Sequence, residues 1–258
     1  MSIKTAVLDG VATIEIARPE KKNAFTAAMY AAFADALRAA DADASVRAVL
    51  VTGQPGMFSS GNDIDEFLAR APSGAASAGA SPALQLMEAM LDFGKPVVAA
   101  VTGPAVGIGA TMLLHCDLVY VADDARIVMP FVSLGLVPEF GSSVILPQLM
   151  GRVRASEKVL LGDPMSGADA VEFGIANAVL PAGEVVNHAR RVAERFNRLP
   201  PASVRETKKL LRRTTLEPLR EAIAAEVAVF AQRLAGPEAK EALQAFLEKR
   251  KPDFSKFG

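Results

Sequence analysis

The chain of 258 residues has one cysteine, Cys116, no tryptophan and two histidines. One cysteine cannot form an intramolecular disulfide, and there is no cysteine and histidine cluster of the kind that binds structural zinc. The 28 basic and 29 acidic side chains leave a net charge of −1, which excludes the basic coat of a general nucleic-acid binder. We therefore expect a cytoplasmic protein that contains no metal ion and binds no nucleic acid.

Long uninterrupted hydrophobic runs are also missing. Residues 1–5 do not begin a charged segment followed by an apolar one, so we expect no signal peptide. The longest stretch without a formal charge runs over residues 96–116, but Gly103, Gly107 and Gly109 interrupt it. This pattern favours a buried strand, a glycine-rich turn and a buried helix over a membrane span.

Alternating strand and helix patterns indicate an α/β fold. The segments 5–8 and 11–17 are rich in β-forming residues, and the Asp9-Gly10 pair between them predicts a hairpin. From about Pro201 onward apolar residues recur at helical spacing. Residues 190–258 carry 16 basic and 9 acidic side chains, which fits either solvated helix faces or contact with an anionic, phosphate-bearing ligand.

Two turns of small residues each follow a buried strand and lead into a helix, at residues 58–64 and 103–109. Backbone N–H groups at such turns can bind a developing oxyanion, although the same turns also serve plain packing. The second turn contains Gly107 and Gly109, but Met112 stands where a dinucleotide fingerprint needs its third glycine. The low-complexity residues 71–82 suggest a mobile loop beside the substrate.

A third segment, residues 134–143, places Glu139 in apolar surroundings. Burial would raise the proton affinity of this carboxylate and suit it to proton transfer. A charge that stabilises a helix N-terminus explains the residue equally well. His115 ends an apolar helix pattern and is expected to be a core residue, whereas His188 is expected to face solvent.

Together these segments resemble the crotonase (enoyl-CoA hydratase/isomerase) superfamily. The similarity covers nearly the whole chain and rests on six segments in the same order: 18–25, 58–64, 103–109, 116–117, 134–143 and 246–251. The resemblance implies a core of ββα spiral turns over residues 1–200 and an α-helical trimerisation module over residues 201–258, which form one functional unit. It also implies an acyl-CoA substrate and a homotrimer, or a hexamer made of two trimers, that contacts no membrane.

The resemblance further assigns residues to the site. The thioester oxygen would lie between the backbone N–H groups of Ser60 and Ile108, with isoleucine in place of the glycine common in hydratases. Coenzyme A would enter as part of the substrate, with no separate cofactor. The residues expected to contact it are Lys21, Lys22, Ser60, Gly61, Asn62, Asp63, Ile64, Gly107, Phe246 and Lys249. Phe246 and Lys249 often reach the ligand of a neighbouring subunit in this family.

The catalytic glutamate distinguishes two branches of the family. Hydratases use two glutamates, and Thr111 and Phe131 occupy the matching positions here. Glu139 instead matches the single glutamate of the Δ3,Δ2-enoyl-CoA isomerase branch, which moves a double bond from 3-enoyl-CoA to 2-enoyl-CoA. The alternatives are an enoyl-CoA hydratase or another CoA-ester enzyme, and a trimer that binds acyl-CoA without catalysis.

Overall fold

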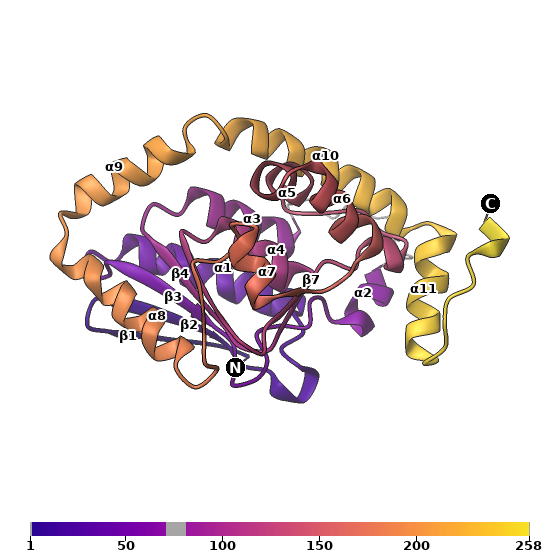
Figure 1. Cartoon of the computed structure of the whole chain (residues 1–258), viewed down its shortest axis with the longest axis horizontal. Coiled ribbons are helices and arrows are strands. Elements are labelled where there is room, and N and C mark those ends of the chain that lie inside the picture. The colour runs from indigo at the N-terminus through magenta and orange to yellow at the C-terminus, as the bar shows by residue number, and fades with distance from the viewer. Residues whose placement is uncertain (1, 71–80, 258) are drawn as a thin grey trace.

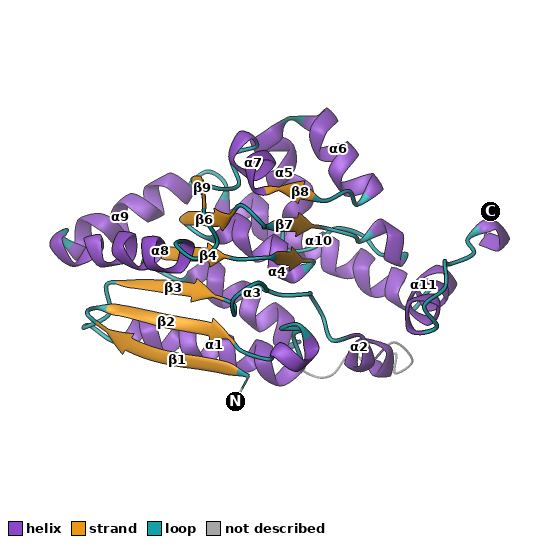
Figure 2. Ribbon diagram, turned by 60° about the horizontal axis from the view of Figure 1, so that its bottom comes forward, coloured by secondary structure: helices purple, strands orange, loops and turns teal. Residues whose placement is uncertain are grey.

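The strands form two sheets in the computed structural model, which describes residues 2–70 and 81–257 (Figures 1 and 2). The strands are β1 (Ile3–Leu8), β2 (Val11–Ile16), β3 (Ala48–Thr52), β4 (Val97–Val101), β5 (Pro104–Val106), β6 (Leu118–Ala122), β7 (Arg126–Val128), β8 (Met165–Ser166) and β9 (Ala178–Leu180). The larger sheet has the order β1-β2-β3-β4-β6-β9, with β1 antiparallel to β2 and all other neighbours parallel. The smaller sheet has the order β5-β7-β8.

The helices cover the larger sheet and extend beyond it. They are α1 (Ala27–Ala42), α2 (Ile64–Arg70), α3 (Pro82–Asp92), α4 (Ile108–Thr111), α5 (Ser142–Met150), α6 (Arg152–Leu161), α7 (Gly167–Glu172), α8 (Val185–Glu194), α9 (Pro201–Arg212), α10 (Leu216–Leu234) and α11 (Pro237–Leu247). Two short 3₁₀ helices matter for the site, η2 (Met112–His115) and η3 (Val132–Leu134). In Figure 1, α9 and α10 run along the top of the molecule, and α11 lies at its right-hand end beside α2.

The central strands β3 and β4 are buried along their whole length because helices pack on both faces of the sheet. Val49 and Val51 point into one hydrophobic cluster with side chains of α1 and α3. Ala48 and Leu50 alternate with them and point into a second cluster with α8. This two-sided burial explains why both strands are continuous apolar runs in the sequence, and it fixes the edge where their carboxyl ends lie.

Most of the expected elements are present. Asp9 and Gly10 have φ angles of 48° and 70°, as a two-residue hairpin requires. The helix after the second glycine turn begins at Ile108 and becomes 3₁₀ at Met112, so it is more irregular than expected. Of the loop expected over 71–82, residues 71–80 lie outside the described part. Its last two residues begin α3, because Ser81 accepts a hydrogen bond from Leu84 N–H.

The uncharged run over residues 96–116 is divided among β4, β5, α4 and η2, as the glycines predicted. Within residues 2–70 and 81–257, no helix combines the length and the apolar character that crossing a bilayer demands.

A buried lysine ties α9, the first helix of the C-terminal region, to the sheet. Lys208 Nζ donates to the Lys95 carbonyl and to Asp117 Oδ2, both at 2.7 Å. The Asp117 carboxylate also accepts from Val97 N–H at the start of β4. The side chain of Lys208 is 8% exposed, so its charge depends on these partners for solvation.

We expect Lys208→Ala to lower the free energy of unfolding by about 2–3 kcal/mol, because it removes the cation paired with a partly buried carboxylate and leaves the Lys95 carbonyl without this donor. Urea unfolding followed by circular dichroism measures this change. The control is Lys209→Ala, since Lys209 forms an exposed ion pair with Glu206 and such pairs contribute about 0–1 kcal/mol. Equal losses for the two variants would contradict this account of α9.

Candidate functional site

The two glycine turns predicted from the sequence meet directly. Ser59 forms a parallel bridge with Ala105, and the Val106 N–H donates to the Ser59 carbonyl at 2.8 Å. Gly61 and Gly107 have φ angles of 93° and 54°. A Cβ on Gly61 would lie 3.1 Å from the Val106 carbonyl oxygen, so a side chain there would push the turns apart. The pairing therefore places the backbone of both turns at one edge of the sheets.

Asn23 anchors the first turn from below. Its buried amide donates to the Met57 and Phe58 carbonyls at 3.0 and 3.2 Å, while Ser59 Oγ donates to the Asn23 carbonyl at 2.9 Å. Lys22 and Asn23 both adopt left-handed φ angles, 51° and 57°. This conformation directs the Lys22 carbonyl towards the first turn.

The two expected oxyanion donors differ in this structure. The Ser60 N–H donates to the Lys22 carbonyl at 3.0 Å, so it already has an acceptor. Ile108 is the first residue of α4, and the N–H of a first helical residue has no acceptor within its own helix. The Ile108 side chain is fully buried, which means that the isoleucine packs into the core and leaves its backbone at the turn.

Several predicted coenzyme A contacts have structural partners in the chain. Asp63 pairs with Arg18 at 2.6 Å and accepts the Asp65 and Glu66 N–H groups at the start of α2. Burial acts to raise the pKa of Asp63, but the hydrogen bonds from Arg18 and the helix hold it below its usual value. Asn62 Oδ1 accepts the Tyr30 hydroxyl at 2.7 Å. These two side chains fix the turn in place.

Glu139 lies one helical turn from the second predicted donor. The Thr111 hydroxyl donates to Glu139 Oε1 at 3.4 Å, and both side chains are buried. Thr111 follows Ile108 by three residues in α4, a rise of about 4.5 Å along the helix axis. The structure thus brings the carboxyl group of Glu139 and the N-terminus of α4 into one site.

The surroundings of Glu139 favour its protonated form. Burial raises the pKa of Glu139 to about 7, the hydrogen bond from Thr111 opposes this, and the charge of Glu226 adds to it. Both protonation states are therefore populated near neutral pH, as a general acid–base catalyst requires. The alternative role as a helix N-terminal charge is wrong, because the first turn of α5 donates to Glu226 instead.

Sequence reasoning missed the two residues that hold this turn. Glu226 of α10 accepts from Gly141 N–H and Ser143 N–H at 2.6 and 3.0 Å. His115 Nε2 lies 2.7 Å from the Phe140 carbonyl oxygen. The rings of His115 and Phe140 are stacked, with 3.7 Å between their centroids. The sequence signal for Glu226 was a single acidic residue between Ile223 and Phe230 on the inner face of the helix.

The two histidines are placed differently from each other. His115 is a core residue, as predicted, and burial lowers its pKa to about 3, so the ring is neutral and donates to the Phe140 carbonyl. The expectation that His188 faces solvent is wrong, because its side chain is half-buried. Its ring packs edge-on against the ring of Tyr120, with 4.6 Å between the two ring centroids.

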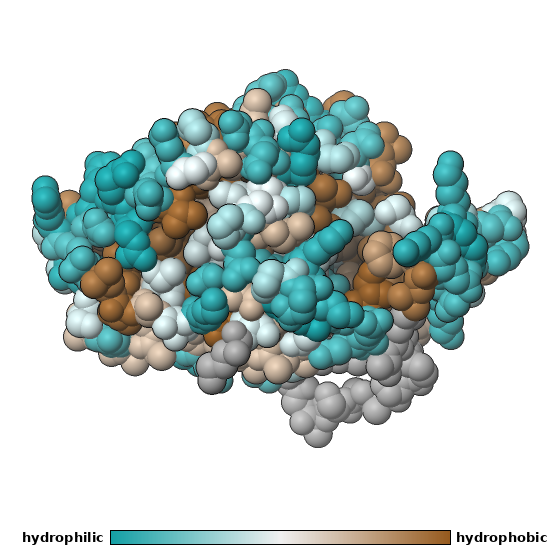
Figure 3. All heavy atoms as spheres, turned by 90° about the horizontal axis from the view of Figure 1, so that it is seen from below, coloured by the Kyte–Doolittle hydropathy of each residue, from teal (hydrophilic) through white to brown (hydrophobic). Residues whose placement is uncertain are grey.

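The C-terminal contacts lie close to the first turn of the same chain. Helix α11 packs against η3 and α2, and α2 follows directly from the Ser60–Asp63 turn. Phe246 is 58% exposed and Lys249 follows the helix on the surface. Figure 3 shows hydrophobic side chains gathered at this end of the molecule. The expected trimer or hexamer, and any contact of α11 with a neighbouring subunit, stay predictions.

Lys21 and Lys22 are exposed lysines in the segment 18–25, which contacts the first turn. Lys21 pairs with Asp65 at 3.1 Å, and the Lys22 side chain is exposed. Both can therefore turn towards a phosphate without leaving a buried partner. Ile64 begins α2, and Gly61 and Gly107 pack closely against each other where the two turns meet.

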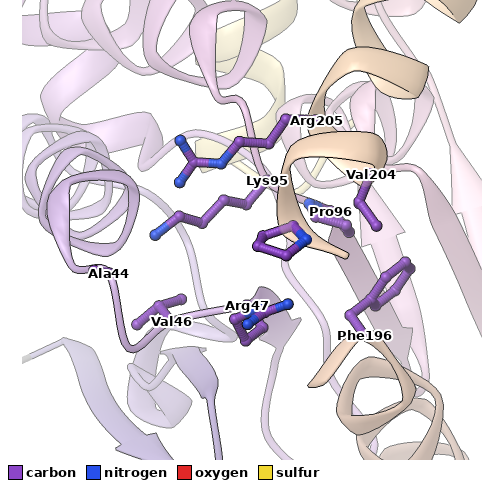
Figure 4. A pocket seen from close by; sticks show the side chains of 9 residues that line it. Ala44, Val46, Arg47, Lys95, Pro96, Phe196, Val204 and Arg205 are labelled. Carbon is purple, nitrogen blue, oxygen red and sulfur yellow. The ribbon is translucent and has the colours of Figure 1, made fainter. Parts of the chain in front are cut away.

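A small pocket lined by Arg47, Lys95 and Arg205 lies elsewhere (Figure 4). Arg47 directly precedes β3 and Lys95 lies two residues before β4, so the pocket is at the edge where the parallel strands begin. The two glycine turns follow the other ends of the same strands. Among the described residues, no acidic side chain lines this pocket.

The buried carboxyl group predicts an unusual pH dependence of stability. The pKa of Glu139 is about 7 in the folded chain against 4.5 for an ordinary glutamate. Protonated Glu139 therefore makes its full contribution to the free energy of unfolding below pH 4.5. This contribution is lost as the pH rises from 4.5 to about 7. Glutamine cannot ionise, so Glu139→Gln should raise the free energy of unfolding by about 3 kcal/mol at pH 8 and change it little at pH 4.

Urea unfolding at both pH values measures this difference, and Glu157→Gln is the control because Glu157 is exposed on α6. The same change in stability at pH 4 and pH 8 would show that Glu139 titrates normally.

Comparison with known proteins shows the family of the chain. The family model described as enoyl-CoA hydratase/isomerase matches residues 7–256. A probable enoyl-CoA hydratase of Bacillus subtilis is 32% identical, with 98% of both chains covered. Human enoyl-CoA delta isomerase 2 is 35% identical over 94% of this chain and 62% of the human protein. Among solved structures, OdaA of Pseudomonas aeruginosa has a TM-score of 0.91 and 50% identity, covering 95% of this chain and 98% of that one.

These relatives share the fold that the sequence predicted, with an α/β core of crotonase type and a helical C-terminal region. Their names include both hydratases and isomerases. On the match to the family model and the shared fold, the chain belongs to the enoyl-CoA hydratase/isomerase family.

Proposed function

We propose that the protein is an enoyl-CoA isomerase that converts 3-enoyl-CoA into 2-enoyl-CoA. The observation that carries this proposal is the buried carboxyl group of Glu139, with a pKa of about 7, which accepts a hydrogen bond from Thr111 at the end of α4. Moving a double bond requires one group that removes a proton from carbon and returns it to another carbon. A carboxyl group that is half ionised at neutral pH suits both steps.

The reaction proceeds in two proton transfers. Ionised Glu139 takes a proton from C2, the electrons of that C–H bond form a C1–C2 double bond, and negative charge moves to the thioester oxygen. The protonated Glu139 then donates to C4, the C3–C4 double bond becomes C2–C3, and the carbonyl re-forms. No atom is gained or lost, and the carboxylate is regenerated.

Backbone donors stabilise the dienolate between the two transfers. The Ile108 N–H meets the thioester oxygen directly, because it begins α4. The Ser60 N–H joins it either by sharing its hydrogen bond with the Lys22 carbonyl or by releasing that carbonyl. One such donor stabilises the transition state by about 3 kcal/mol. The contribution of the first turn therefore depends on whether the Ser60 N–H shares or releases the Lys22 carbonyl.

Two features disfavour a hydratase. The buried Thr111 and Phe131 occupy the positions of the hydratase glutamates, and neither can activate water as a base. The other carboxylate nearby, Glu226, accepts hydrogen bonds from Gly141 and Ser143 and is not free to move a proton. Hydration therefore lacks its second acid–base group.

The test offers the purified protein 3-enoyl-CoA and 2-enoyl-CoA in separate assays. An isomerase produces the ultraviolet absorbance of the conjugated thioester from the first substrate, whereas a hydratase removes it from the second. Glu139→Gln should lower the isomerisation rate by roughly 10²–10⁴-fold with little change in substrate affinity. The control Glu157→Gln should retain the native rate. Hydration without isomerisation, or binding without either reaction, would refute the proposal.

A second prediction concerns coenzyme A binding at the C-terminus. Lys249→Ala should raise KM several-fold and leave kcat nearly unchanged, because a phosphate contact far from the reacting carbons binds substrate and transition state alike. Lys251→Ala is the matched control, an exposed lysine two residues away. Steady-state kinetics separates the two constants. A large fall in kcat with KM unchanged would show that Lys249 has another role.

A further inference from the structure

We propose that Glu226, in helix α10 of the C-terminal region, is the positioning residue for Glu139: it fixes the turn that carries the catalytic carboxyl group. This inference rests on the proposed function of Glu139 and deepens it, since nothing in the sequence motif assigns a role to Glu226.

The Glu226 carboxylate binds the residues that follow Glu139 and Phe140 through hydrogen bonds. One oxygen accepts from Gly141 N–H at 2.6 Å, and the other accepts from both the N–H and the hydroxyl of Ser143. Glu226 is 8% exposed, so these donors replace water as its solvation. The bonds join α10 to the residues on the far side of the turn from Glu139.

The turn itself is strained and needs such support. Phe140 has a φ of 55° and Gly141 a φ of 71°, and the left-handed region is unfavourable for a bulky aromatic residue. On the core side, His115 holds the Phe140 carbonyl at 2.7 Å and stacks on its ring. On the helical side, Glu226 holds the next N–H. The strained peptide is thus held at both ends.

Ser142 fixes the backbone of Glu139. The N–H and the hydroxyl of Ser142 both donate to the Glu139 carbonyl, at 3.1 and 2.6 Å. Ser142 and Ser143 together begin α5. Because Glu226 holds the first residues of α5 by hydrogen bonds, it also fixes the direction in which the Glu139 side chain leaves the backbone.

The groups around Glu139 determine how easily its carboxyl group ionises. They are Thr111 from α4, the neutral ring of His115 behind Phe140, and the carboxylate of Glu226 from α10. Arg212 lies beyond His115 and acts on that ring. Of these groups, Glu226 adds to the burial that raises the pKa of Glu139, because a second negative charge nearby disfavours ionisation. A neutral side chain at position 226 removes this contribution.

The experiment titrates the Glu139 carboxyl carbon by ¹³C NMR in protein labelled at glutamate, without substrate, and assigns its signal by its absence in Glu139→Gln. In Glu226→Gln we expect the titration midpoint to fall, because the second negative charge is gone, and the acidic limb of kcat/KM to move with it. We expect kcat to fall at least 10-fold with KM within two-fold, because the turn loses one of its two holds. Glu221→Gln, an exposed change on the same helix, should alter neither.

Glu226→Asp is the second variant, in case the glutamine protein unfolds. It keeps the charge but shortens the reach, so kcat should fall while the titration midpoint stays within about 0.3 pH units. An unchanged midpoint together with an unchanged kcat in either folded variant would overturn the inference. A wild-type protein that is inactive on 3-enoyl-CoA would instead refute the proposed function, since the titration is measured without substrate.

Discussion

The carboxyl group of Glu139 is held out of water between a helix of the core and a helix of the C-terminal region, and the site is organised around this constraint. Burial makes the ionised form costly, and the hydrogen bond from Thr111 offsets part of that cost. A fully solvated glutamate would be ionised at neutral pH and could accept a proton but hardly donate one. The enclosed position makes both directions of proton transfer accessible to one side chain.

The sequence predicted the parts of the site that are local in the chain. Both glycine turns, the hairpin at Asp9-Gly10 and the catalytic candidate Glu139 are visible in short segments, because a turn or a lone carboxylate leaves a local pattern. The family resemblance added that Ser60 and Ile108 belong to one site. The pairing of Ser59 with Ala105 then shows how the two turns are joined.

Contacts between distant segments could not be predicted in the same way. Glu226 and Gly141 are 85 residues apart in the sequence, and one acid on an amphipathic helix looks like any solvated charge. The hydrogen bond from Ser60 N–H to Lys22 depends on two consecutive left-handed residues, for which neither Lys nor Asn gives a firm signal. Three-dimensional packing decides these contacts, and they hold the segments that carry the residues the sequence does identify.

The helical C-terminal region therefore contributes contacts to the candidate site as well as supporting the sheet. Lys208 fastens α9 to the sheet, Glu226 of α10 fastens the catalytic turn, and α11 packs beside the first glycine turn through α2. The predicted division at residue 200 coincides with the start of α9, yet the site draws on residues from both sides of it. Removing the helices would leave Phe140 in a strained conformation with one support.

The central claim, that one carboxyl group performs both proton transfers, is tested most directly by following deuterium from C2 to C4. A 3-enoyl-CoA deuterated at C2 is converted in ordinary water in a single turnover, and the product is examined by mass spectrometry and NMR. The account predicts that a measurable fraction of the deuterium reappears at C4, because a buried carboxyl group exchanges with water slowly compared with its second transfer. A C4 position filled entirely by hydrogen from water would contradict it and point to a second proton donor.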